Sequence, residues 1–190
     1  MKPILLAAAL AVSATSAFAA AEKYVLDSSH SQVVFTYNHL GFSTTTGMFS
    51  GFEGEIMFNQ ADPAASSVTV SMPVVEMITG WKPREDHFMS EDFFAAAEGD
   101  LATFTSTGIE VTGENTAKIT GDLTLNDITK PVVLDATLNQ VGEHPMAGKQ
   151  WAGFDATTTL LRSDFDLGQF APFVSDEVEI SISIEAQKAE

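Results

Sequence analysis

The stretch from Asp27 to Phe58 reads DSSHSQVVFTYNHLGFSTTTGMFSGFEGEIMF. Aromatic and aliphatic side chains recur in it at every second position, first at Val33, Phe35 and Tyr37 and again at Phe52, Ile56 and Phe58. This period of two, with β-branched and aromatic residues, is typical of strands that bury one face. Because two such strands are not stable alone, their apolar faces need further strands to cover them. The stretch therefore predicts a larger antiparallel β-structure.

Further alternating runs supply these strands, at residues 68–74, 103–111, 117–125, 131–138, 153–162 and 177–185. Ser90 is expected to cap one short helix that continues through Ala97, whereas residues 76–90 are expected to be irregular. About eight amphipathic strands at hairpin spacing favour an antiparallel barrel or a sandwich, and periodicity leaves both open. A closed barrel of about eight strands can hold one small ligand inside.

The first 19 residues have the pattern of a secretory signal peptide. Lys2 precedes an apolar run over residues 4–12, and Ala17-Phe18-Ala19 forms a small-x-small cleavage site. Cleavage there would leave residues 20–190 as a single domain in the periplasm. The chain has no cysteine, so disulfides and lipid attachment to a leader cysteine are not expected. No later stretch is long and apolar enough to cross a membrane, so integral membrane insertion is not expected.

The chain is strongly acidic, with 26 Asp and Glu against 9 Lys and Arg and a formal net charge of −17. Such a surface repels nucleic-acid backbones and anionic lipid head groups. A nucleic-acid partner is therefore not expected, nor is binding to membranes through charge. The acidic excess is interpreted as a source of solubility.

Specific residues of the opening stretch resemble the start of the YceI-like proteins. The matching positions are His30, Ser31, Phe35, His39, Leu40, Gly41, Ser43, Gly47, Phe49, Phe52, Gly54, Ile56 and Phe58. The resemblance continues through Arg84, Asp86 and His87, through Thr129-Lys130-Pro131 and through Arg162-Ser163-Asp164-Phe165. It departs at Asp100, Asp127 and Asp166, where proline or glycine is usual. Because Asp tolerates left-handed turn geometry, these departures concern loop shape rather than the barrel.

YceI-like proteins are exported bacterial proteins whose lipocalin-like barrel holds a polyisoprenoid or a similar long-chain lipid. The resemblance thus implies an all-β, antiparallel, about eight-stranded lipocalin-like barrel with one short helix and an apolar internal channel. It also implies a bound isoprenoid lipid or isoprenoid quinone as the ligand, with no cofactor.

The inward-facing apolar side chains would simply fill the centre of a sandwich, whereas the resemblance implies that they line a channel. The chain holds 14 Phe against 2 Tyr and 2 Trp, and Phe offers bulk without a polar group to satisfy. The expected channel residues are Phe35, Tyr37, Phe49, Phe52, Ile56, Val70, Met72, Phe88, Phe93, Phe104, Leu123, Leu134 and Phe154.

A lipid head group needs hydrogen-bond donors near the channel mouth. The candidates are His39, Arg84, His87 and Arg162. Structural ion pairs remain the alternative for both arginines, Arg84 with Glu85 or Asp86 and Arg162 with Asp164. The four His residues have no paired metal-ligand spacing, and no nucleophile motif is present, so neither a metal site nor catalytic residues are assigned.

The sequence thus favours a non-catalytic periplasmic carrier of a long-chain isoprenoid. Two alternatives stay open. One is a periplasmic enzyme that acts on such a lipid, with His87 or Arg84 as the polar catalyst, and the other is a stress-related structural binding domain. The sequence also leaves a homodimer open.

Overall fold

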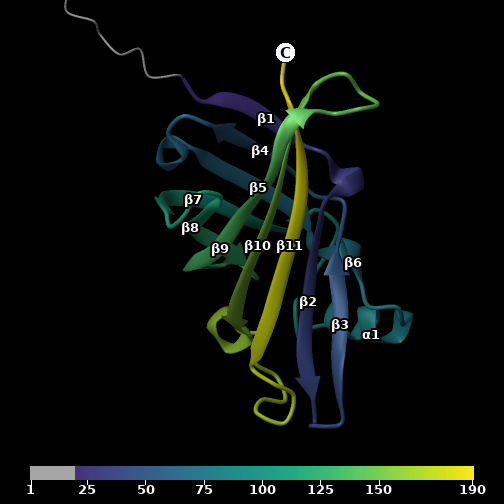
Figure 1. Cartoon of the computed structure of the whole chain (residues 1–190). Coiled ribbons are helices and arrows are strands. Elements are labelled where there is room, and N and C mark those ends of the chain that lie inside the picture. Colours follow the sequence, from purple (N-terminus) through teal and green to yellow (C-terminus); the bar gives the residue numbers. More distant parts are fainter. Residues whose placement is uncertain (1–19) are drawn as a thin grey trace, which may run out of the picture.

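The computed structural model describes residues 20–190, and the signal peptide expected at residues 1–19 lies outside the described part. The strands are β1 (Glu22–Leu26), β2 (Gln32–His39), β3 (Ser43–Phe49), β4 (Glu53–Phe58), β5 (Ser67–Pro73), β6 (Met77–Ile78), β7 (Leu101–Val111), β8 (Thr116–Leu125), β9 (Ile128–Glu143), β10 (Gln150–Leu161) and β11 (Glu177–Lys188). One α-helix, α1 (Lys82–Phe88), lies beside β3 (Figure 1). Short 3₁₀ turns cover Ser28–His30, Pro63–Ala65, Val74–Glu76 and Arg162–Phe165.

Antiparallel pairing closes the sheet into a barrel. Eight strands form the ring in the order β1-β4-β5-β7-β8-β9-β10-β11, and β11 pairs with β1 to complete it. The long strand β11 serves two partners, because its residues 186–188 pair with β1 and its residues 179–183 pair with β2. From β2 the sheet continues through β3 to β6 as an extension of the barrel wall. The expected eight-stranded antiparallel barrel is confirmed, and the sandwich is excluded.

A buried apolar cluster lies where β1 packs against β4, β10 and β11. Its members are Tyr24, Leu26, Phe52, Ile56, Phe58, Ala152 and Ala186. Aromatic edges meet there, with the ring of Phe58 at 5.9 Å from Tyr24 and at 5.6 Å from Phe154, centroid to centroid. A second buried cluster, Phe35, Phe49, Met77 and Val178, lies where β2 and β3 meet β6 and β11. Burying one such side chain stabilises a fold by about 1.5–3 kcal/mol, so these clusters hold the barrel without disulfides.

The helix was predicted in the wrong place. It spans Lys82–Phe88, within the segment expected to be irregular, and residues 91–94 form turns instead. Ser90 does not start a helix, because its hydroxyl donates to the carbonyl of His87 at 2.7 Å and so closes α1. Ala95 has φ +45°, which no continuing α-helix allows. Trp81, an unusual residue for this role, stands at the N-cap of α1, so Pro83 in the first turn is the sequence signal that could have indicated its start.

Two acidic turn residues behave as expected from their sequence positions. Asp127, next to Asn126 in the β8–β9 hairpin, has φ +58°, and Asp166 at the end of the Arg162–Phe165 turn has φ +56°. Both lie in the left-handed region, where Asp is tolerated better than most residues.

Candidate binding cavity

Two cavities occupy the interior of the molecule. The larger has a volume of about 980 Å³ and the smaller a volume of about 260 Å³. They have Phe49, Leu125, Leu160 and Ile180 in common as lining residues, so they lie end to end. We call the larger the outer chamber and the smaller the inner chamber.

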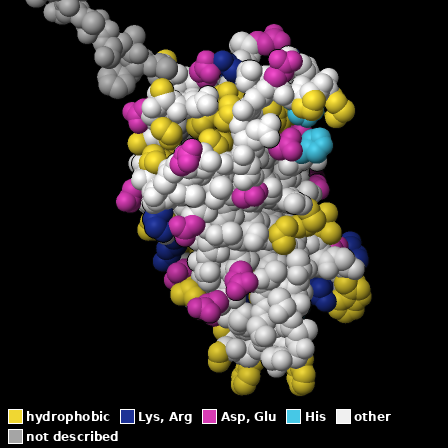
Figure 2. All heavy atoms as spheres, viewed as in Figure 1, with side chains coloured by type: hydrophobic (Ala, Val, Ile, Leu, Met, Phe, Trp, Pro, Cys, Tyr) yellow, Lys and Arg dark blue, Asp and Glu magenta, His cyan; other side chains and the backbone are white. Residues whose placement is uncertain are grey.

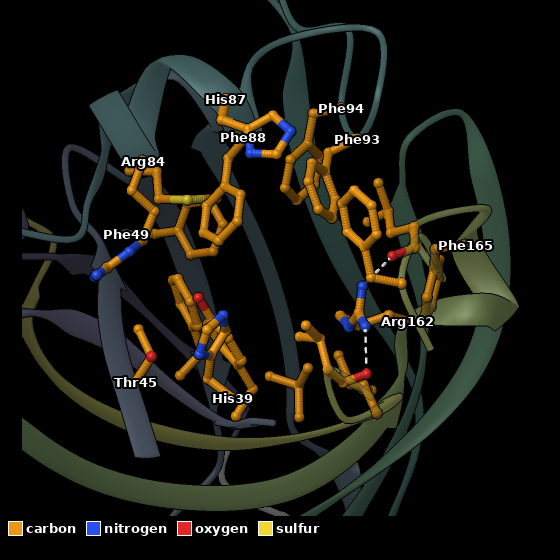
Figure 3. Close-up of a pocket in the computed structure, with 18 of the residues that line it drawn as sticks. His39, Thr45, Phe49, Arg84, His87, Phe88, Phe93, Phe94, Arg162 and Phe165 are labelled. Carbon is orange, nitrogen blue, oxygen red and sulfur yellow. Dashed lines mark hydrogen bonds between the residues drawn. The ribbon is translucent and has the colours of Figure 1, made fainter. Parts of the chain in front are cut away.

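The outer chamber lies between the β2–β3 hairpin and α1. Aromatic rings form much of its wall. Between ring centroids, Phe35 is 5.6 Å from Phe49, Phe88 is 5.2 Å from Phe93, and Tyr37 is 6.2 Å from Phe88. Figure 3 shows the rings of Phe49, Phe88 and Phe93 around the opening. The chamber reaches solvent, because its lining residues Leu40, Trp81, Phe170 and Phe173 have exposed side chains.

The inner chamber lies within the closed ring of eight strands. Its walls are almost entirely apolar and come mainly from β4, β5, β7, β8, β9, β10 and β11, with Val33 of β2, Phe49 of β3 and the turns at residues 63–66 and 113–115 completing them. Every side chain predicted to line a channel lies on the wall of at least one chamber. Phe35, Tyr37, Phe88 and Phe93 line the outer chamber, Phe49 lines both, and the inner chamber is lined by Phe52, Ile56, Val70, Met72, Phe104, Leu123, Leu134 and Phe154. Contact of these residues with a ligand stays a prediction.

Glycines on two strands make room for the rings of this wall. A Cβ at Gly47 would lie 2.2 Å from Cζ of Phe35, and a Cβ at Gly121 would lie 2.3 Å from Cζ of Phe104. Real Cβ atoms do not approach other atoms this closely. The two glycines therefore allow Phe35 to lie close to β3 beside the outer chamber and Phe104 to lie close to β8 beside the inner one, which leaves space in both chambers.

The four residues predicted to meet a head group all line the outer chamber. Arg84 and His87 come from α1 on one side of the opening, and Arg162 lies on another side (Figure 3). Arg84 stacks over Trp81 at 5.7 Å from the ring centroid and donates weakly, at 3.4 Å, to the carbonyl of Thr79. His87 Nε2 lies 3.0 Å from Asp92 Oδ2. His39 is exposed at the end of β2.

Arg162 also has a structural role, because it holds a loop in place. Its guanidinium donates to the carbonyls of Ser175 at 2.9 Å, of Val174 at 3.1 Å and of Gln169 at 3.3 Å, and also to the carbonyl of Leu167. Four of its five N–H donors are thus directed at one loop, residues 167–175. Burial lowers the pKa of Arg162 from its ordinary value. The alternative ion pair with Asp164 is not what holds this side chain.

Several lining residues were not predicted. Phe94, Phe165, Leu167, Phe170 and Phe173 line the outer chamber, yet they come from turns and loops, where no periodicity identifies an inward face. Leu125, Leu160 and Ile180 follow the alternation of their strands, and that pattern could have identified them.

A cluster of three polar residues, Asp27, His30 and Glu185, lies away from both chambers. Carboxylate oxygens of Asp27 and Glu185 and a ring nitrogen of His30 lie within 4.8 Å of one another. His30 Nδ1 is 2.6 Å from Asp27 Oδ2, and this hydrogen bond raises the pKa of His30 and lowers the pKa of Asp27. The sequence did not indicate this group, since Glu185 joins it only through the pairing of the two chain ends.

Among residues 20–190, no helix has the length and apolar character needed to span a membrane.

Comparison with known proteins identifies the family. The YceI-like domain matches residues 24–186. The chain is 42% identical over 169 residues to a UPF0312 protein of Ectopseudomonas mendocina, and the match covers 88% of this chain and 88% of that protein. It is 40% identical over 178 residues to the Protein YceI of Escherichia coli O157:H7, and this match covers 94% of this chain and 92% of that protein.

Solved structures share the fold. The crystal structure of Burkholderia cenocepacia BcnA matches with a TM-score of 0.76 and 27% identity, covering 84% of this chain and 98% of BcnA. A polyisoprenoid binding domain from Saccharophagus degradans matches in fold with a TM-score of 0.68 at 13% identity, covering 87% of this chain and 98% of that domain. With a family match over nearly all described residues and relatives of 40% identity or more, the chain belongs to the YceI-like domain family.

Proposed function

We propose that this protein is a non-catalytic periplasmic carrier that holds one long-chain polyisoprenoid or isoprenoid quinone in its two chambers. The observation that carries the proposal is the pair of adjoining apolar chambers, one inside the closed barrel and one at its mouth, where aromatic and basic residues line the opening. The fold is shared with a domain described as polyisoprenoid binding. The outer chamber alone reaches the upper end of the range of about 300–1,000 Å³ that small-molecule pockets occupy.

The energetics favour a long hydrocarbon chain. Each buried CH₂ contributes about 0.8 kcal/mol, so one five-carbon isoprene unit contributes about 4 kcal/mol. Losing translational and rotational freedom costs about 4–15 kcal/mol, and ordering the chain adds to this cost. A single unit therefore does not bind tightly, whereas several units do. Affinity should rise with the number of isoprene units until the chambers are full.

We expect the head group to lie in the outer chamber, because the inner chamber suits only the hydrocarbon chain. The inner chamber offers a phosphate or a quinone carbonyl almost no donors, and an unpaired polar group there would cost about 1–3 kcal/mol. Arg84, His87 and His39 stand at the outer chamber with donors that a head group can reach. These residues orient the ligand, and burial of its chain holds it.

A reconstitution experiment tests this function and separates a carrier from an enzyme. Protein stripped of lipid with organic solvent and refolded is incubated with a polyprenol, repurified and extracted for mass spectrometry. The proposal expects one polyprenol per chain, recovered unchanged. A chemically altered polyprenol would indicate an enzyme, and no uptake would contradict lipid carriage.

A pair of neighbouring variants shows whether the lipid occupies the chamber. Thr45 lines the outer chamber, whereas the adjacent Thr46 is exposed on the opposite face of β3. Thr45→Trp fills space that several CH₂ groups would occupy and should weaken polyprenol binding about tenfold or more. Thr46→Trp adds the same bulk outside and should bind as the unmodified protein does. Equal binding by both variants would place the lipid elsewhere.

A further inference from the structure

Two loops form a single tip at the open end of the molecule. The β2–β3 turn and the loop of residues 167–175 are joined by a hydrogen bond from the Leu40 amide to the Phe173 carbonyl at 3.0 Å. A second bond, from the Ser175 amide to the Asn38 carbonyl at 2.9 Å, and a bridge between His39 and Val174 reinforce the contact. Arg162 fixes the second loop from behind through its carbonyls. The tip is therefore an ordered surface, and we call it the aromatic tip.

The aromatic tip exposes large apolar side chains. The exposed fraction is 90% for Phe42, 74% for Phe173, 50% for Phe170 and 47% for Leu40. Exposed apolar residues are ordinary when scattered singly, but a gathered set marks an interaction surface. In Figure 2 the lower end of the molecule, where β2 meets β3 in Figure 1, shows hydrophobic side chains and no charged ones.

Local conformation gives a second reason to assign these side chains a role. Leu40 has φ +56° and Phe170 has φ +66°, in the left-handed region that Gly or Asn occupies at less cost. Phe170 contacts Phe93 and His87 within the chain, with ring centroids 6.1 and 6.3 Å apart, while half of its surface stays exposed. Leucine and phenylalanine at positions that a small or polar residue would fit at less cost make the rim of the outer chamber apolar on its solvent side as well.

The charge pattern indicates which surface they contact. Residues 32–52 and 167–175 contain no Asp, Glu, Lys or Arg, although 18% of the chain is charged and the net charge is −17. A protein partner of such an acidic chain would be expected to meet basic or acidic side chains at the rim of the interface. A projecting tip with aromatic side chains and no charge instead fits the interfacial layer of a lipid bilayer, where aromatic rings are favoured.

We propose that the aromatic tip inserts into the surface of an uncharged, zwitterionic bilayer and places the opening of the outer chamber against it. Leu40, Phe170 and Phe173 line both the tip and the chamber, so a lipid could pass between bilayer and barrel without crossing water. This purpose rests on the proposed function, but the docking itself does not. Phe42 is at the tip and outside the chamber lining, which separates docking from ligand binding.

Vesicle co-sedimentation of the full mature chain tests the proposal. The protein is expected to bind phosphatidylcholine vesicles, and to bind vesicles containing phosphatidylglycerol less at low salt because its net charge is repelled. Phe42→Ser and Phe173→Ser should each weaken vesicle binding about tenfold, which corresponds to removing one phenylalanine from an apolar environment. Met146→Ser is the matched control, since Met146 is 89% exposed in the loop between β9 and β10.

The outcomes are distinct. Absent binding to phosphatidylcholine vesicles, or an equal loss in Met146→Ser, overturns the proposal. A monomer–dimer equilibrium that Phe42→Ser weakens, without vesicle binding, also overturns it and assigns the tip to a second copy of the chain. Polyprenol uptake in the absence of vesicles should be unchanged in Phe42→Ser. If uptake fails in every protein while vesicle binding persists, the carrier function is wrong and the docking surface stands.

Discussion

Replacing Gly47 by Ala tests how the protein keeps its outer chamber open. The three heavy atoms nearest to a Cβ at this position all belong to the Phe35 ring, at 2.2, 2.7 and 2.9 Å. Carbon atoms reach their best separation at about 3.5–4.0 Å, so the ring must move by roughly 1.5 Å. Because β3 lies on one side of the ring, the movement is into the outer chamber.

The expected cost of Gly47→Ala is about 1–3 kcal/mol in the free energy of unfolding, the usual range for overpacking a buried site. Urea unfolding followed by circular dichroism measures it. Gly108→Ala is the matched control, since Gly108 is also in a strand and a Cβ there meets nothing within 4 Å. This control should unfold at the same urea concentration as the unmodified protein or at a higher one.

A double variant shows whether the cost arises from the ring itself. Phe35→Leu removes the atoms that the new methyl group meets, so Gly47→Ala should cost less in a Phe35→Leu background than alone. Polyprenol binding should also fall in Gly47→Ala, because the displaced ring takes chamber volume. If Gly47→Ala is as stable as Gly108→Ala, or if the two substitutions are additive, the close approach of Phe35 to Gly47 does not shape the chamber.

Three further predictions concern single side chains. The hydrogen bond with Asp27 should give His30 a pKa above its ordinary value in an NMR titration, and Asp27→Asn should lower that pKa. The contribution of this histidine to stability should be full below its unfolded pKa and lost as the pH rises through the raised folded pKa. Asp127→Gly should raise the free energy of unfolding by up to about 1 kcal/mol in urea, because Asp127 has φ +58° and glycine adopts this conformation without strain, and a loss of stability would show that its side chain matters. Arg162→Lys should speed proteolytic cleavage within residues 167–175, since one ammonium group cannot reach the carbonyls that the guanidinium spans, and unchanged cleavage would refute this role.

Strand periodicity could predict the barrel and most of its lining because both depend on local alternation. Val178, Ile180 and Ile182 face inward as their spacing requires, and the same holds for Leu123 and Leu134. Strand β3 escaped prediction as a separate strand because its Ser43-Thr44-Thr45-Thr46 run has no apolar alternation. β3 is a strand because its backbone pairs with β2, and the alternating pattern that indicates a strand is in β2.

Other features depend on contacts that no local pattern reports. Arg162 was predicted as a head-group residue from its type, but its bonds to a loop up to 13 residues away arise only in the folded chain. The position of α1 was missed because Trp81 replaces the usual capping residue. Phe42 and Phe173, in turns, carry no sequence signal that separates an exposed phenylalanine from a buried one.

The proposed carrier function requires that the chambers hold an isoprenoid lipid in the cell. Native mass spectrometry of the protein purified without detergent from its own host tests this requirement directly. One prenyl lipid per chain is expected, released on unfolding, with a lower occupancy in Thr45→Trp than in Thr46→Trp. A mass equal to that of the polypeptide alone, in protein that also fails to take up added polyprenol, would contradict the carrier function.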